Sequence, residues 1–434
     1  MKILILSWYF PPVNSIGAVR IGKLARFLDA RGHEIGVAAG SDWGLPETLP
    51  LGFTLERLAY ARVRDINAPP RPANDLLRRL RGGGAAGDAV GASAGTATGT
   101  SLARRARVFY TNLLNVPDNR IGWYPDLVRQ ALRLARGWRP DIVFGSAPPF
   151  TALLACRRVA HRLGVPWVAE LRDAWADDTY SPHPPWRLAI DQKVERFVLG
   201  SAAGLVCVTE PWSDFYRAKY GKPVETAYNG YDPADFPFDP AAPPAGTARE
   251  VRIVYTGGIY PGRRDPTPLF EALRLLGPEA DGFRVEFFGT DPAAVWPLAD
   301  RAGVRRLVAV HPPVPFRESI AAQWNADVLL LLQWNDPREH GICPGKFFEY
   351  LGSLRPILGI GYEQGVPAEF VRARKAGVFA NEPAKIAEHL RGWAAEKAAH
   401  GCVRRLPVAV REGLERDRQY EKLEAFLARF VGNK

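Results

Sequence analysis

The chain has 434 residues, of which 47% are hydrophobic and 24% charged, and its formal net charge is +11 at pH 7. This composition is typical of a folded globular protein, and the length favours two domains of roughly 200 residues each. The longest apolar run, at 328–332, is far shorter than the roughly 20 residues of a membrane-spanning helix, so no transmembrane segment is expected.

The cysteines are far apart in the sequence and form no paired motif with one another or with a close His. We therefore expect neither a disulfide nor a metal centre, and a reducing cytoplasm suits the chain. The apolar start, MKILILSWYFPP, is too short for a secretion signal and has no small-residue cleavage site after it, so it predicts a buried strand. The cysteines are Cys156, Cys207, Cys343 and Cys402.

The positive charge leaves two explanations open, a solvated basic surface or contact with an anionic membrane surface on the inner face of the cytoplasmic membrane. A nucleic-acid partner is not expected, because the sequence has no recognition motif and no stacking aromatics interleaved with its basic residues. The basic residues that flank a flexible stretch are Arg78, Arg79, Arg81, Arg104, Arg105 and Arg107.

Strand-like runs alternate with helical patterns, which predicts α/β domains with parallel sheets covered by helices on both faces. The first helix carries Ile21, Leu24 and Leu28 on one face and ends near Gly32. The series ends near Phe236, which predicts an N-terminal domain over 1–236. Its strands are expected at 2–7, around 35–37, and near 141–145, 167–171 and 205–209.

Residues 81–101 are rich in Gly, Ala, Ser and Thr without apolar periodicity, so they predict a flexible insertion. A second stretch rich in Pro and Ala predicts a linker over 237–250. A second doubly wound domain is expected over 251–405, and a helical pattern over 406–434 is expected to pack back on the first domain. The strands of the second series are expected at 251–256, 284–288, 307–310, 328–332 and 356–360.

The run GICPGKFFEYLGSLRP, residues 341–356, joins a loop to a helix that carries a cation and a carboxylate. Pro344 and Gly345 suit a helix entry, whose free N–H groups attract phosphate, and Lys346 adds a positive charge there. Glu349 lies about one turn further along the same face, where it could accept hydrogen bonds from ribose hydroxyls. An ordinary amphipathic helix with a solvated Lys and Glu is the alternative.

Two Rossmann-like series and this loop and helix together resemble the GT-B fold, and specifically the retaining glycosyltransferase family 4 in its bacterial polysaccharide-type members. The resemblance covers nearly the whole chain. It implies two domains that face each other across a cleft. In YFPPVNSIGAVRIGKLARFLDARGHEIGV it places Ser15, Ile16 and Gly17 against the donor diphosphate, although the family's Gly pair is reduced here to Gly17. A tight turn that only joins strand and helix is the alternative.

The segment WVAELRDAWADD resembles the family's Arg-Asp-x-Trp motif, which implies that Arg172, Asp173 and Trp175 lie on the acceptor side at the end of a strand. A structural ion pair between the Arg and the Asp is the alternative. In IVYTGGIYPGRRDPTPLFEAL the resemblance implies a diphosphate cradle that contains Gly257 and Gly258, with Arg263 or Arg264 as a cation.

Three further matches complete the implied donor site. The segment VHPPVPFRESI places Val314 and Pro315 beside the nucleotide base. In the family's paired-glutamate motif Glu349 matches the second, ribose-binding residue, preceded by Cys343, Pro344 and Gly345. The first glutamate falls on Gly341, and Glu339 or His340 is a candidate to replace it.

The resemblance implies transfer of a sugar from a nucleoside-diphosphate sugar to a glycan or lipid-linked glycan, with retention. The implied catalytic residues are Arg263, Arg264, Lys346 and Glu349. No cofactor is expected, and no metal, because the cationic side chains can stabilise the leaving diphosphate. A GT-B nucleotide-sugar epimerase and a non-catalytic nucleotide-sugar-binding module are the alternatives.

Overall fold

The computed structural model describes residues 1–41, 43–64, 109, 111–178, 183–239 and 249–432. The flexible insertion expected at 81–101 and the six flanking arginines lie outside these residues, as does most of the expected linker. The chain forms two compact units. The first contains Met1–Phe10, His33–Gly44 and Thr54–Ala203, and the second contains Pro11–Gly32, Leu45–Phe53 and Gly204–Lys434. The domain bounds expected from the sequence stay a prediction.

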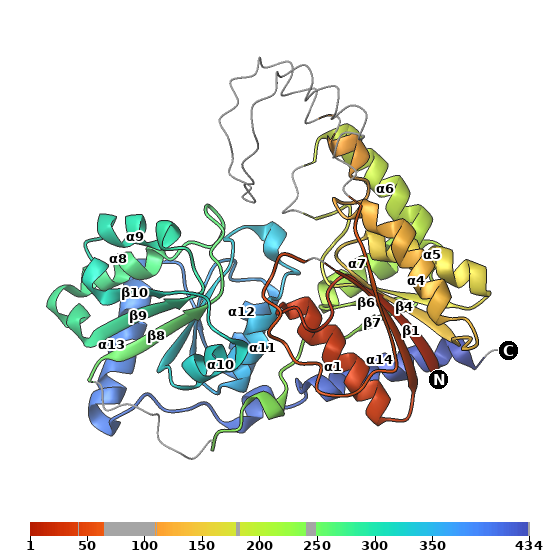
Figure 1. Cartoon of the computed structure of the whole chain (residues 1–434). Helices are drawn as coiled ribbons and strands as arrows, with labels where there is room; N and C mark the ends of the chain where they lie inside the picture. The colour runs from red at the N-terminus through yellow and green to blue at the C-terminus, as the bar shows by residue number, and fades with distance from the viewer. Residues whose placement is uncertain (42, 65–108, 110, 179–182, 240–248, 433–434) are drawn as a thin grey trace, which may run out of the picture. The chain divides into compact units, whose positions relative to one another are not determined.

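A parallel sheet has the strand order β3-β2-β1-β4-β5-β6-β7. All residues of β4 and β5 are buried, as expected for a parallel sheet that is covered on both faces. Its strands are β1 (Lys2–Ser7), β2 (Glu34–Gly40), β3 (Arg57–Ala61), β4 (Ile142–Ala147), β5 (Trp167–Leu171), β6 (Gly204–Cys207) and β7 (Val224–Thr226). Among the described residues of the first unit, the α-helices are α4 (Tyr124–Leu134), α5 (Thr151–Leu163) and α6 (Pro185–Leu199) (Figure 1).

A second parallel sheet, within the second unit, has the order β10-β9-β8-β11-β12-β13. The strands are β8 (Val251–Thr256), β9 (Phe283–Phe288), β10 (Val308–His311), β11 (Val328–Leu332), β12 (Ile357–Ile360) and β13 (Gly377–Phe379). The helices of this unit are α1 (Ile16–Ala30), α7 (Glu210–Tyr220), α8 (Thr267–Leu276), α9 (Pro292–Arg301), α10 (Phe316–Trp324), α11 (Gly345–Gly352), α12 (Val366–Arg374), α13 (Pro383–His400) and α14 (Arg416–Val431).

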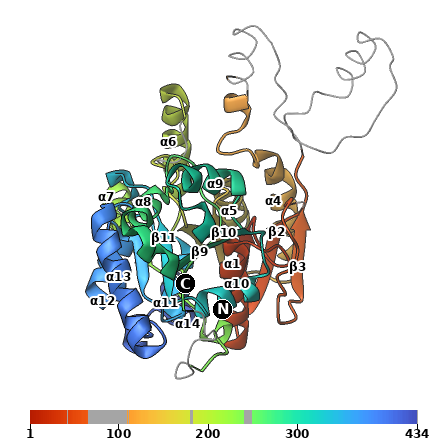
Figure 2. The ribbon, with the colours of Figure 1, turned by 90° about the vertical axis from the view of Figure 1, so that its left-hand side faces the viewer.

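Neighbouring residues of one strand enter two different cores. Ile253 of β8 packs with α8, α9 and α13, whereas Val254 packs with α10, α11 and α12. In β11, Leu330 packs in the same core as Ile253, and Leu331 packs in the same core as Val254. Successive side chains of a strand point to opposite faces of the sheet. The second sheet is therefore doubly wound (Figure 1 and Figure 2). The predicted α/β class with two parallel sheets is confirmed.

Helix α14 packs against α1 and β7, which belong to the same unit. The Tyr420 hydroxyl donates a hydrogen bond of 2.7 Å to the Arg20 carbonyl, and Leu423, Phe426 and Leu427 are buried, as their stripe in the sequence predicts. In the part of the chain that is described, no helix combines the length and apolar character needed to cross a membrane.

Candidate active site

A cavity of about 300 Å³ lies at the carboxyl edge of the second sheet, and all of its lining residues belong to the second unit. Thr256 ends β8 and Phe288 ends β9, and the glycines that follow, Gly257 and Gly289, line the cavity with them. Strand order reverses between β8 and β11. Open α/β sheets bind ligands at this kind of switch point, so the cavity is the candidate active site.

Helix α11 brings the predicted cation and carboxylate to this cavity. Pro344 is extended and Gly345 begins the helix, as expected from the sequence. Phe347, Phe348 and Leu351 are fully buried in the core, whereas Lys346 and Glu349 both line the cavity. One turn of α11 therefore presents opposite charges to the same space.

The Lys346 ammonium is buried, with 9% of the residue exposed. Its Nζ lies 4.1 Å from the centre of the Tyr255 ring, and no described residue accepts a hydrogen bond from it. Burial lowers the pKa of Lys346, the Arg264 charge acts in the same direction, and Tyr255 and Glu349 act against both. A buried cation without an acceptor is costly, and an anion in the cavity would supply the missing partner.

Glu349 is held by one amide. Gln323 Nε2 donates to Glu349 Oε2 over 3.1 Å and to Thr256 Oγ1 over the same distance. Burial raises the pKa of Glu349, while the hydrogen bond from Gln323 and the charges of Arg416 and Lys346 lower it. A carboxylate oriented in this way can accept hydrogen bonds from two neighbouring hydroxyl groups of a ligand.

The start of α1 forms another wall. Ser15 caps this helix, because its Oγ accepts a hydrogen bond of 3.2 Å from the Ala18 N–H, and Ser15 and Ile16 line the cavity. A Cβ on Gly345 would lie only 3.0 Å from Ile16 Cγ2, so the starts of α1 and α11 approach closely. Helix N-termini present free N–H groups that favour anions. Gly17 is buried in the first turn of α1 and is not a lining residue.

The structure places only one residue of the predicted diphosphate cradle, Gly257, in the lining of the cavity. Gly257 lines the cavity, and Gly258, which does not, leaves open space where a Cβ would stand. Arg264 acts electrostatically on Lys346, and its guanidinium lies 4.5 Å from the Tyr260 ring centre. The Arg263 guanidinium lies 4.7 Å from the Trp334 ring centre. Neither arginine lines the cavity.

The remaining predicted donor residues fall in different places. Val314 lines the cavity. Pro315 precedes α10 and lines a neighbouring cavity, described below. Cys343 is buried in the hydrophobic core beside α11, where burial raises the pKa of its thiol. Pro344 caps α11 with its backbone and does not line the cavity.

Arg172, Asp173 and Trp175 follow β5 in the first unit, at the carboxyl end of the strand as predicted. Arg172 Nη2 donates a hydrogen bond of 2.6 Å to the Pro148 carbonyl. Trp175 is buried and stacks on Phe150, with 4.7 Å between the ring centres. Asp173 is exposed. The acceptor-side role of these three residues stays a prediction.

The structure gives a physical reason for glycine at position 341. A Cβ there would lie 2.8 Å from Trp212 Nε1, and the Gly341 carbonyl accepts a hydrogen bond of 2.7 Å from Thr209 Oγ1. A larger residue would displace the Trp212 ring. Glu339 is buried and His340 is exposed, with its Nδ1 2.9 Å from the Gln364 carbonyl, and neither lines the cavity.

Residues 97–235 match the model of Glycosyltransferase Family 4. The predicted resemblance to this family is confirmed. No curated protein matches the chain. The family match supports glycosyltransferase activity.

Several solved structures share the fold at low sequence identity. Anabaena HepE, in complex with UDP and glucose, is 14% identical with a TM-score of 0.62, and the match covers 99% of this chain and 100% of HepE. WaaG, a glycosyltransferase involved in lipopolysaccharide biosynthesis, is 14% identical with a TM-score of 0.56 and full coverage of both chains. The lipopolysaccharide outer core galactosyltransferase WaaB is 12% identical with a TM-score of 0.56, over 99% of this chain and 100% of WaaB. The GT-B fold is thus shared along the whole length.

Sequence reasoning missed several polar residues that line the cavity or hold its carboxylate, among them Arg20, Gln323 and Arg416. Arg20 had a detectable signal, because it lies four residues before Leu24 on the apolar face of the first helix. The residue is 1% exposed, and its guanidinium donates to the carbonyls of Ala227 and Tyr228 over 2.9 Å. Gln323 and Arg416 had no comparable signal in the sequence.

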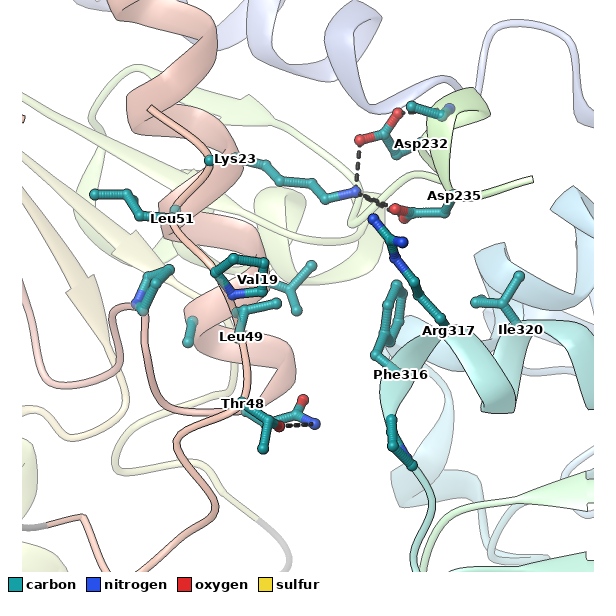
Figure 3. A pocket seen from close by; sticks show the side chains of 18 of the residues that line it. Val19, Lys23, Thr48, Leu49, Leu51, Asp232, Asp235, Phe316, Arg317 and Ile320 are labelled. Carbon is teal, nitrogen blue, oxygen red and sulfur yellow. Dashed lines mark hydrogen bonds and ion pairs between the residues drawn. The ribbon is translucent and has the colours of Figure 1, made fainter. Parts of the chain in front are cut away.

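A larger cavity of about 640 Å³ adjoins the first and shares Asn14, Val19 and Phe316 with it. Its polar corner is already neutralised: Lys23 Nζ lies 2.5 Å from Asp232 Oδ2 and 2.6 Å from Asp235 Oδ1 (Figure 3). Lys346, in contrast, has no such partner among the described residues. The smaller cavity is therefore the better candidate for an anionic ligand, despite its size.

Proposed function

We propose that this protein transfers a sugar from a nucleoside-diphosphate sugar to a hydroxyl group of an acceptor, and that the cavity beside α11 binds the donor. The observation that carries the proposal is the buried Lys346 ammonium, without an acceptor, one turn from the Glu349 carboxylate in the same cavity. A nucleoside diphosphate likewise combines an anionic group, which a cation can bind, with a vicinal diol, which a carboxylate can bind. Lys346 binds the diphosphate in this proposal, and Glu349 binds the ribose.

The proposed reaction forms a bond between the acceptor oxygen and the anomeric carbon. The bond from that carbon to the diphosphate oxygen breaks, and its electron pair leaves with the nucleoside diphosphate, which also takes up the acceptor proton. Negative charge develops on the leaving oxygen. Lys346 and the N–H groups at the starts of α1 and α11 stabilise this charge, and Arg264 adds to the positive field.

Retention at the anomeric carbon, a hexosyl group and a glycan or lipid-linked glycan acceptor are the finer parts of the proposal. They rest on the family resemblance. The HepE structure holds UDP and glucose, and WaaG and WaaB are named for lipopolysaccharide synthesis, which supports a bacterial glycan as the acceptor class. Surface polysaccharide or glycoconjugate biosynthesis is the role that we propose.

In this proposal, cationic side chains rather than a metal ion stabilise the leaving diphosphate. Among the described residues, no three His, Cys, Asp or Glu side chains are grouped to hold a metal ion. Activity that survives removal of divalent cations with EDTA is the expected result. Loss of turnover in EDTA and its return with Mg²⁺ or Mn²⁺ would assign the charge stabilisation to a metal instead.

Donor binding is tested by the thermal shift of the native chain with UDP-, GDP-, ADP- and dTDP-sugars. One nucleotide class is expected to raise the melting temperature, and Glu349→Gln is expected to lose most of that shift. The matched control is Glu369→Gln, since Glu369 is an exposed carboxylate on α12 and should leave the shift unchanged. An equal response of both variants would remove Glu349 from the donor site.

Turnover is tested by incubating the matching donor with bacterial glycan and lipid-linked glycan fractions. Release of nucleoside diphosphate that depends on the acceptor, together with a glycosylated product, is expected. The anomeric coupling constant of the product reports retention or inversion. A donor that binds, but is neither transferred nor changed with any acceptor, would favour the non-catalytic binding module.

A further inference from the structure

We propose that Arg416, the first residue of α14, is a positioning residue of the donor site, which presents Glu349 to the ribose diol as an anion. This inference rests on the proposed function and deepens it. The residue is carried by the last helix of the chain, more than sixty positions after the motif on α11. It lies in no motif that the sequence analysis identified.

Arg416 faces the same cavity as Glu349, and 6% of the residue is exposed. Its Nη2 donates a hydrogen bond of 3.0 Å to the Gly230 carbonyl. Its Nε is buried, and no described residue accepts a hydrogen bond from it. The guanidinium is therefore fixed at one end and has spare donor capacity at the edge of the cavity.

The backbone on both sides of Arg416 is held by a short parallel bridge. The Arg416 N–H donates to the Tyr231 carbonyl over 2.7 Å, and the Tyr231 N–H donates to the Leu414 carbonyl over 3.0 Å. The approach depends on Gly230, whose φ is +65°. A Cβ there would lie 2.9 Å from the Arg416 Cα. Glycine at position 230 thus allows the backbone to approach Arg416 closely.

Besides burial, the groups that act most strongly on the pKa of Glu349 are Gln323 on α10, Arg416 on α14, Lys346 on α11 and Asp235, and the buried Arg20 lines the same cavity. Burial favours the protonated carboxyl, and Asp235 acts in the same direction. The Arg416 charge opposes this effect more strongly than the Lys346 charge does. Once a diphosphate pairs with Lys346, Arg416 is the cation in this set that stays available to Glu349.

The sign of the pH effect follows from the raised pKa of Glu349. An ionised carboxylate accepts hydrogen bonds from both ribose hydroxyls, and a protonated one accepts fewer. Nucleotide affinity should therefore fall as the pH drops through a value above the ordinary 4.5. Removal of Arg416 raises the pKa further, so the loss of affinity begins at a higher pH.

The experiment measures the dissociation constant of UDP by calorimetry from pH 5 to 8 for the native chain, Arg416→Met and Arg416→Lys. UDP is the probe because it is present in the HepE structure. We expect the Met variant to bind UDP about tenfold more weakly than the native chain at the acidic end of this range. The fall of UDP affinity at low pH, which we call the acid limb, should begin at a higher pH in this variant. The Lys variant should restore most of the native profile.

Two further variants separate positioning from structure. Arg416→Gln can keep the hydrogen bond to the Gly230 carbonyl without the charge, and it replaces the Met variant if that one does not fold. Arg411→Met is the matched control, because Arg411 binds the Gly352 carbonyl in the preceding segment and does not line the cavity. 2′,3′-Dideoxy-UDP lacks the diol but keeps the terminal phosphate, whose own protonation at about pH 6 weakens binding, so its loss of affinity at acid pH should be the same in every variant.

The outcomes distinguish this inference from the function on which it rests. A native chain that binds UDP with an acid limb, and Met and Gln variants with the same limb, would overturn the role of Arg416 alone. If the native chain binds none of UDP, GDP, ADP and dTDP, both the donor site and the role of Arg416 are wrong. If the acid limb moves to higher pH in the Met variant and returns to its native position in the Lys variant, the result supports both the donor site and the role of Arg416.

Discussion

The strongest single constraint on function is the Lys346 side chain, which is buried without an acceptor among the described residues. Its lowered pKa means that the folded chain binds this proton less tightly than the unfolded chain does. Stability of the ligand-free protein should therefore rise with pH in a window below the ordinary 10.5. Donor affinity should fall in that same window, because the cation is lost.

Lys346→Met separates these two effects. The variant removes a poorly solvated charge, so we expect the ligand-free protein to be more stable by about 1–3 kcal/mol at pH 7, while it binds donor at least tenfold more weakly. Urea denaturation and calorimetry measure the two quantities. Lys346→Arg, which stays charged, should bind donor without the alkaline loss. A Met variant that is less stable and binds normally would show that Lys346 has a structural role.

Two adjacent glycines after β8 offer a matched pair of substitutions. Gly257 has a φ of +105°, and a Cβ there would lie 2.7 Å from Lys346 Nζ, whereas a Cβ on Gly258 meets nothing within 4 Å. We expect Gly257→Ala to lower stability by about 1–2 kcal/mol and to weaken donor binding by displacing the ammonium. Gly258→Ala should leave both nearly unchanged. Thermal denaturation and donor titration of the pair test this, and equal effects would contradict it.

At the scale of elements, the sequence predicted the bounds of several buried strands to the residue. β1, β5, β8 and β11 have the bounds that the sequence predicts, because strands buried on both faces leave a clear apolar signal. β3 was missed because most of its residues are only partly buried and form no continuous apolar run, and β7 and β13, with three residues each, were missed as well. A strand of three residues has too little sequence for its period to be recognised.

In the candidate site, too, residues with a local sequence signal were predicted and residues that depend on long-range contacts were not. Lys346 and Glu349 were predicted from local spacing on one helix, and the structure places both in the cavity. Arg20 and Arg416 reach it only through tertiary contacts with the segment at 227–230, which lies far from both in the sequence. Spacing within a segment cannot show such contacts. The contribution of these two arginines to the cavity could therefore be recognised only from the structure.

Helix α1 is joined to the segment after β7 by an ionic cluster (Figure 3). The side chains of Lys23, Asp232 and Asp235 are 16%, 13% and 17% exposed, whereas Arg26, 3.4 Å from Asp232, is 47% exposed. Burial would raise the pKa of Asp232, yet the Lys23 charge and hydrogen bond lower it overall. The stability from this pair is present above the ordinary 3.8 and is lost as the pH falls through the lowered value.

Lys23→Met leaves two half-buried carboxylates without their cation. We expect it to lower the free energy of unfolding by about 2 kcal/mol at pH 7, and to weaken donor binding slightly because α1 supplies a wall of the cavity. Arg26→Met, the control on the same helix, should cost less than about 0.5 kcal/mol because its pair is solvated. Denaturant titrations at pH 7 compare them. Equal losses would mean that the cluster does not anchor α1.

At the scale of the whole molecule, the net charge of +11 is the feature that the donor site does not account for. Lys346, Arg20 and Arg416 are few among 57 basic residues. A lipid-linked acceptor would place the enzyme beside anionic headgroups, where each Lys or Arg near the surface contributes about 1 kcal/mol of attraction. Peripheral binding to the inner face of the cytoplasmic membrane is our proposal.

Sedimentation with lipid vesicles tests this proposal. We expect binding to vesicles that contain phosphatidylglycerol, little binding to vesicles of phosphatidylcholine alone, and loss of the difference between 0.1 and 0.5 M NaCl, because salt screens charge. Replacing Arg78, Arg79 and Arg81 by Gln should weaken the binding, while donor affinity, which depends on residues of the second unit, stays constant. Equal partition to both kinds of vesicle, or none at low salt, would assign the charge to a solvated surface. The acceptor would then be sought among soluble glycans, because attraction to anionic headgroups would no longer bring the enzyme to a lipid-linked one.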